Sequence, residues 1–96
     1  MDDADWRVPE WHPDHGDPAR EVALLRSLWN ALRPGFTGRL VDHEPGYLSL
    51  LLFRDGLEFA EVMIVRGRRQ FGVFLRQGSD EERYFTTAQE AAAFLS

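Results

Sequence analysis

Residues 47–66 read YLSLLLFRDGLEFAEVMIVR, and this segment specifies the centre of the fold. Two runs of apolar and β-branched residues flank Asp55-Gly56, and Asp-Gly between such runs is the strongest short signal for a two-residue type I′ β-hairpin. The turn pairs Arg54 with Leu57. Counting outward predicts three further pairs: Leu52 with Phe59, Leu50 with Glu61 and Leu48 with Met63. In this register both faces of the hairpin are apolar near its centre.

Each of the two apolar faces of the sheet must be shielded from water by another part of the chain or by a partner. An antiparallel sheet with one face in water normally alternates apolar and polar residues along each strand. Two helices can cover one face, which leaves the other for the Trp-containing N-terminal segment, a second subunit or a partner protein. The alternative is one helix on each face. A large apolar patch left in water is unusual for a monomer, so a homodimer or a partner interface is an expected outcome.

Turn signals at short spacing extend the hairpin into a larger sheet. They are Glu44-Pro45-Gly46, Gly67-Arg68 and Gly78-Ser79-Asp80. Connections this short join antiparallel neighbours. We therefore expect a five-stranded antiparallel meander, with strands near residues 36–43, 47–54, 57–66, 70–77 and 82–86.

Helix patterns flank the sheet at both ends. Asp17-Pro18 predicts a helix start, with the carboxylate at the N-cap and the proline at the first helical position. An apolar stripe with helical spacing follows, and Pro34-Gly35 ends it. Thr87-Ala88-Gln89-Glu90 matches a capping box that opens a short C-terminal helix. The predicted fold class is α+β, in the order α-β-β-β-β-β-α over residues 18–96, after an acidic arm with Trp and Pro over residues 1–17.

The amino-acid composition limits the kinds of protein that this chain can be. The chain has 96 residues, a size that fits one domain. It contains no cysteine, which excludes disulfides and thiolate chemistry and favours a reducing compartment. No run approaches the roughly 18 apolar residues of a membrane-spanning helix, and the opening MDDAD is unlike a basic secretory signal. We expect a cytoplasmic protein without membrane contact.

The net charge of −5 is concentrated at the N-terminus. Residues 1–18 hold an excess of acidic residues over their one arginine, whereas acidic residues and arginines balance from residue 19 onward. Non-specific binding to nucleic acid needs a cationic stripe, so we expect no direct nucleic-acid binding. A partner protein with a basic surface, or a second copy of the chain, is the expected partner.

Two groups of residues are candidates for partner contact. Acidic and aromatic side chains suit a basic protein surface, and the candidates are Trp6, Trp11, Asp14, Asp17, Asp80, Glu81 and Glu82. Arginines at a predicted hairpin tip suit carboxylates or phosphate, and these are Arg66, Arg68 and Arg69. The alternative for the arginines is a solvated turn that discourages edge-to-edge aggregation.

One cluster has the residue types of a metal site. His12, Asp14 and His15 lie close together in the sequence, and imidazole with carboxylate suits Zn²⁺ or Ni²⁺. The alternative is a solvated, proline-stiffened segment that leads into the first helix. No other pattern implies a cofactor.

Catalytic patterns are weak. Glu61 interrupts an apolar face, and a bulge that turns it outward or an ion pair with Arg76 competes with a role as general base. His43 lacks the spacing of a catalytic triad, and no phosphate-binding glycine motif occurs. We expect a non-enzymatic protein of bacterial or phage origin that acts by protein–protein contact, as an inhibitor, immunity factor or accessory subunit. The alternative is a small-ligand or metal-binding domain.

Overall fold

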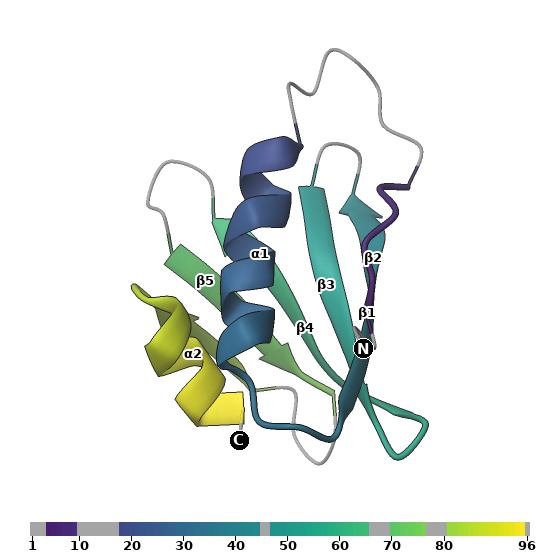
Figure 1. Cartoon of the computed structure of the whole chain (residues 1–96). Helices are drawn as coiled ribbons and strands as arrows, with labels where there is room; N and C mark the ends of the chain where they lie inside the picture. Colours follow the sequence, from purple (N-terminus) through teal and green to yellow (C-terminus); the bar gives the residue numbers. More distant parts are fainter. Residues whose placement is uncertain (1–3, 10–17, 45–46, 66–69, 77–80, 96) are drawn as a thin grey trace.

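The protein folds as an α+β structure in which two helices pack on one side of a six-stranded sheet (Figure 1). The computed structural model describes residues 4–9, 18–44, 47–65, 70–76 and 81–95. The elements are β1 (Ala4–Asp5), α1 (Ala19–Ala31), β2 (Phe36–Glu44), β3 (Tyr47–Arg54), β4 (Leu57–Val65), β5 (Gln70–Leu75), β6 (Glu82–Phe85) and α2 (Ala88–Leu95). The fold class predicted from the sequence is confirmed.

The sheet has one strand more than expected. Strands β2 to β6 form the predicted antiparallel meander, and β1 joins its edge parallel to β2, with Ala4 opposite Gly38 and Asp5 opposite Arg39. The sequence predicted an extended acidic arm over residues 1–17, without a strand in the sheet. A two-residue strand is too short to show alternation, and its partner lies far away in the sequence, so local patterning carries no signal for it.

The helices begin close to the predicted signals. Pro18, with φ −74°, is the N-cap of α1, so the helix starts one residue later than the sequence suggested, and Asp17 lies outside the described residues. The helix ends at Ala31, and its C-cap Leu32 has an extended conformation. In α2 the side chain of Thr87 caps the helix, which is one of the two hydrogen bonds of the predicted capping box. The backbone N–H of Glu90 donates to Thr87 Oγ1 at 3.2 Å, and that hydroxyl donates to the Glu90 carboxylate at 3.1 Å.

The hairpin between β3 and β4 has the predicted turn and a shifted register. Asp55 and Gly56 both have positive φ, 54° and 80°, as a type I′ turn requires, and Arg54 lies opposite Leu57. Beyond the turn a β-bulge changes the pairing. The predicted pairs of β3 with β4 further out are wrong by one residue, because the observed pairs are Leu52 with Ala60, Leu51 with Glu61, Leu50 with Val62 and Ser49 with Met63.

The bulge has a physical reason. Phe59 is the extra residue, and without it Glu61 would point toward the helices, where an ionised group in an apolar core is costly. With the bulge, Ala60 and Val62 point to the helices instead and are fully buried. The carbonyl of Phe59 accepts the backbone N–H of Arg76 at 2.9 Å, so the bulge leaves that oxygen bonded.

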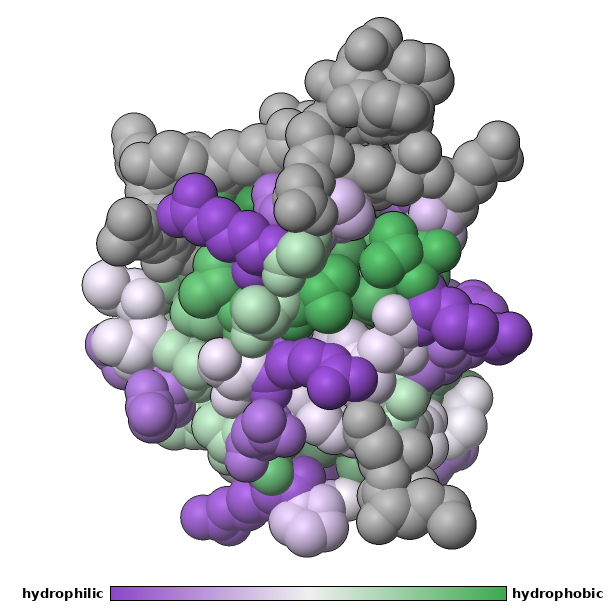
Figure 2. Space-filling model, turned by 45° about the horizontal axis from the view of Figure 1, so that its top comes forward, coloured by the Kyte–Doolittle hydropathy of each residue, from purple (hydrophilic) through white to green (hydrophobic). Residues whose placement is uncertain are grey.

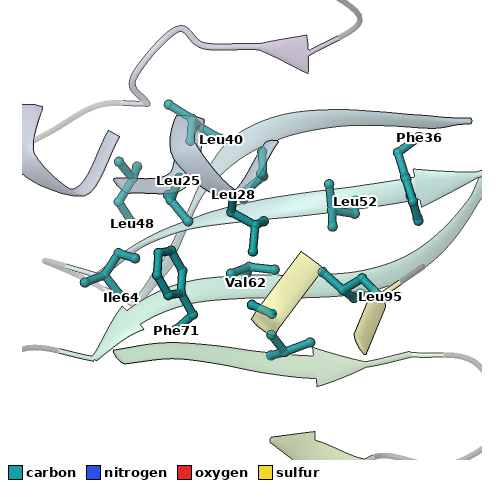
Figure 3. Packing of buried hydrophobic residues seen from close by; sticks show 14 residues of the cluster. Leu25, Leu28, Phe36, Leu40, Leu48, Leu52, Val62, Ile64, Phe71 and Leu95 are labelled. Atoms are coloured by element: carbon teal, nitrogen blue, oxygen red, sulfur yellow. The ribbon is translucent and has the colours of Figure 1, made fainter. Parts of the chain in front are cut away.

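The hydrophobic core lies between the helices and the sheet (Figure 3). Helix α1 packs on α2, β3 and β4, and α2 packs on β5 and β6. Leu25 and Leu28 of α1 are fully buried against the sheet. The buried cluster consists of Leu25, Leu28, Phe36, Leu40, Leu48, Leu50, Leu52, Ala60, Val62, Ile64, Phe71, Val73, Ala91 and Leu95. One face of the sheet is therefore closed by both helices, which rules out one helix on each face.

The outer surface on the helix side is mixed in character. Hydrophobic side chains reach that surface in a limited central area, with strongly hydrophilic side chains around it (Figure 2). Exposed arginines, including Arg20, Arg26 and Arg33, lie on and after α1. This pattern is the ordinary surface of a helix that buries its other side.

Candidate functional site

The side of the sheet opposite α1 and α2, here the helix-free face, is the candidate site. No described helix or strand lies over it (Figure 1). Its apolar side chains come from all five antiparallel strands, β2 to β6. They are Val41, Leu51, Phe53, Met63, Val65, Phe74 and Tyr84. Most of them are half-buried, and Tyr84 is 51% exposed.

Strand pairing arranges this face in transverse rows. In one row the register places side by side Arg39, Leu51, Glu61, Phe74 and Glu82, one from each strand from β2 to β6. The next row holds Val41, Ser49, Met63, Gly72 and Tyr84. Neighbours in a row have Cβ atoms about 5 Å apart. The face therefore carries apolar side chains on both sides of Glu61, with Asp5 and Arg39 at the β1–β2 margin and Glu82 at the β6 margin.

An ion pair between a buried carboxylate and a partly exposed arginine lies near the centre of the helix-free face. Glu61 is 3% exposed, and its Oε1 accepts a hydrogen bond from Arg76 at 2.8 Å. Its Oε2 accepts a hydrogen bond from the hydroxyl of Ser49 at 3.0 Å, and Ser49 is fully buried. Both predicted structural outcomes, the bulge and the ion pair with Arg76, are thus found together. Both carboxylate oxygens of Glu61 accept hydrogen bonds from side chains of the same chain. This arrangement argues that Glu61 has a structural role in the sheet.

The margins of the face carry opposite charge. On β2, the guanidinium of Arg39 lies 5.6 Å from the centre of the Phe53 ring. On β6, the hydroxyl of Tyr84 donates to the carboxylate of Glu82. This hydrogen bond is the main reason why the pKa of Tyr84 lies above its ordinary value, with desolvation and the charge of Glu82 adding to it. Both Arg39 and Glu82 are exposed to solvent.

Trp6 belongs to the helix side of the molecule. Its ring packs edge-to-face on Trp29 of α1, with ring centres 6.3 Å apart, and the guanidinium of Arg26 lies 4.8 Å from the Trp6 ring centre. Next to it, Asp5 accepts hydrogen bonds from the Arg7 side chain and backbone, which lower the pKa of Asp5 to about 2. The described part of the N-terminal segment therefore does not cover the helix-free face.

The candidate residues from the sequence fall in different places. Glu82 lies on the helix-free face, and Glu81 forms an ion pair of 2.6 Å with Arg83. The remaining partner candidates and the metal candidates lie outside the described residues: Trp11, His12, Asp14, His15, Asp17, Arg66, Arg68, Arg69 and Asp80. His43 lies in β2, and its side chain is outside the description. Within residues 4–9, 18–44, 47–65, 70–76 and 81–95, no three His, Cys, Asp or Glu residues gather as a metal site would require.

Sequence reasoning missed several residues of the face. Arg39, Met63 and Phe74 share it only because the bulge reverses β4 relative to the simple register. A signal was present in Glu61 itself, because a carboxylate among apolar residues favours a register that turns it away from the helices.

Comparison with known proteins provides no further assignment. Family models, curated proteins and solved structures yield no significant match to this chain. In the part of the chain that the structure describes, no helix is long and apolar enough to cross a membrane. The functional argument therefore rests on the residues and geometry given above.

Proposed function

We propose that this protein acts by protein–protein contact, without catalysis, and that the helix-free face binds a second copy of the chain. The observation that carries the proposal is the set of half-buried apolar side chains on a face that no described element covers. Large contiguous apolar patches are unusual on monomeric proteins, and they mark interaction sites. We propose that the protein works as an inhibitor, an immunity factor or an accessory subunit, because proteins in these roles act by contact with other proteins.

The charge of the face favours a second copy over a strongly basic partner. Its charged residues are close to balance. The basic ones are Arg7, Arg39 and Arg76, and the acidic ones are Asp5, Glu58, Glu61 and Glu82. A basic partner would be attracted by an acidic surface, whereas an apolar face near neutrality meets its own copy without net repulsion. Two sheets that pack face to face lie about 10 Å apart and interdigitate their side chains, which suits this surface.

The experiment is the solution mass of the full chain by sedimentation over a range of concentrations. We expect a dimer, and we expect Met63→Glu to convert it to a monomer, because Met63 lies in the middle of the face. Val41→Lys, at the margin on β2, is a second variant in case Met63→Glu unfolds. Leu57→Glu is the matched control, since Leu57 is 63% exposed beside the β3–β4 turn and already faces water.

Two outcomes would overturn the proposal. One is a wild-type chain that stays monomeric at the highest concentration. The other is a dimer that Met63→Glu and Val41→Lys, both folded by circular dichroism, leave as tight as the wild type. Dissociation by Leu57→Glu alone would instead assign the contact to the hairpin tip.

A further inference from the structure

We infer that two copies pack face to face about a two-fold axis parallel to the strands, so that β2 of each copy lies over β6 of the other and Arg39 meets Glu82 of the second copy. This inference rests on the proposed function, because it specifies the partner arrangement at the same face. It adds which residues select the second copy and fix its orientation.

The first step is the order of charges along one row. Arg39 stands at the β2 end, Glu82 at the β6 end, and Glu61 on the central strand β4. Leu51 and Phe74 fill the places between them. Asp5 of β1 extends this row beyond Arg39, and Arg7 pairs with the Asp5 carboxylate at 2.7 Å. The β1–β2 margin is thus net positive, the β6 end is negative, and the row is apolar on both sides of Glu61.

The second step is the symmetry of a self-contact. In a two-fold interface each patch meets its own copy, so a residue and its partner exchange places. An axis parallel to the strands at β4 reverses the strand order, which sets Arg39 over Glu82 of the second copy and Leu51 over Phe74. An axis along the row, perpendicular to the strands, sets Arg39 over Arg39 and Glu82 over Glu82. Like charges in contact oppose binding, so the charge order favours the first arrangement.

The third step is that both charged ends are available. Arg39 and Glu82 are exposed. Arg39 lies beside Asp5, and its charge helps to lower the pKa of that carboxylate, but the hydrogen bonds of Asp5 come from Arg7. In the described part of the chain neither Arg39 nor Glu82 has an ion-pair contact within 4.0 Å. Arg39 lies over the Phe53 ring, and Glu82 accepts a hydrogen bond from Tyr84, which holds each charge at its margin of the face. Each dimer would contain the Arg39–Glu82 contact twice.

The central carboxylate does not oppose this arrangement. The axis brings the two copies of Glu61 toward each other, but Arg76 of the same copy neutralises each one at 2.8 Å. In the neighbouring row, Val41 then lies over Tyr84 of the second copy, and the two Met63 side chains meet near the axis. Apolar groups therefore meet apolar groups beside the charged contacts.

The test is a pair of charge reversals, Arg39→Glu and Glu82→Arg, studied alone and mixed. Each variant alone replaces both intermolecular contacts by like charges, and we expect its dimer to be about tenfold or more weaker than the wild type. A heterodimer of the two variants joins opposite charges at both contacts, because one contact is reversed and the other keeps the native pair. We expect the mixture to form heterodimers with close to wild-type affinity, and both effects to diminish at high salt.

Arg33→Glu is the matched control. It changes the net charge as Arg39→Glu does, but Arg33 is exposed just after α1 on the helix side. We expect its dimer to be as tight as that of the wild type. Circular dichroism of each variant checks that the fold is retained.

The outcomes separate the arrangement from the proposed function. A wild-type dimer that Met63→Glu dissociates, but that both charge reversals leave equally tight, would overturn the arrangement and leave the contact face in place. The arrangement would also be overturned if each charge reversal weakened the dimer but the mixed variants did not form heterodimers. A monomeric wild-type chain would overturn both the arrangement and the proposed function.

Discussion

The two faces of this sheet differ in how their apolar side chains leave water. On the helix side, α1 and α2 close a core in which Leu25, Leu28 and Leu50 are fully buried. On the helix-free face, apolar side chains of the same strands surround the ion pair between Glu61 and Arg76, and most of them stay half-exposed. Apolar content alone therefore does not separate the helix-closed core from the helix-free face. Glu61 and its arginine partner distinguish them, because a helix-closed core would have excluded that charge.

Leu50 and Leu51 are neighbours in β3 that point to opposite faces of the sheet, and alanine substitutions at these two positions test the difference between the faces most strongly. Leu50→Ala empties space in the closed core and should lower the free energy of unfolding by about 2–5 kcal/mol. Leu51 on the helix-free face is 8% exposed and lies outside the cluster that the helices close, so we expect Leu51→Ala to cost less, about 2 kcal/mol. Urea denaturation at a concentration where the chain is monomeric measures both. Equal losses would mean that the helix-free face is closed within one copy.

The second-largest expected loss of stability comes from removing the ion pair between Glu61 and Arg76. Arg76→Ala leaves the carboxylate of Glu61 buried without its cation and should cost about 1–3 kcal/mol, below the full range for buried pairs because Arg76 is 41% exposed. Glu61→Gln keeps the shape and an acceptor for Ser49, so its cost should be smaller. Denaturant unfolding compares both with Arg33→Ala, an exposed arginine on the helix side. A larger loss for Glu61→Gln than for Arg76→Ala would contradict the assignment of the pair.

The smallest effect concerns the edge strand β1. Hydrogen bonds from Arg7 lower the pKa of Asp5 from 3.8 to about 2, so the folded state favours the ionised carboxylate. The stabilisation is then present above pH 3.8 and is lost as the pH falls through about 2. Thermal unfolding should show a small difference between the wild type and Asp5→Asn that vanishes over this window and weakens with salt.

Arg7→Gln is the control for this pair. Combined with Asp5→Asn, it should change the melting temperature no further, because the hydrogen-bond acceptor is already neutral. A difference between wild type and Asp5→Asn that stays constant as the pH falls through this window would show that the ion pair is not its cause.

Much of the fold was readable from short patterns. The Asp55-Gly56 turn, the five antiparallel strands and the helix cap at Thr87 follow from contacts between residues close in sequence, where turn chemistry and propensity act directly. The candidate site was only partly readable. Glu61 and Arg76 were recognisable as a pair, but their face was assigned through a register that the bulge shifts by one residue.

Residue order and local chemistry determined where each helix and strand of the meander forms, because hydrogen bonds in turns and caps join near neighbours. Packing between distant segments selected the bulge at Phe59, the placement of both helices on one side and the pairing of β1 with β2. The side-chain period of a strand is two, so one extra residue moves every later side chain to the opposite face. The face is selected by whether Glu61 or Val62 points toward the helices, and that choice has an energetic consequence only once the helices are in place.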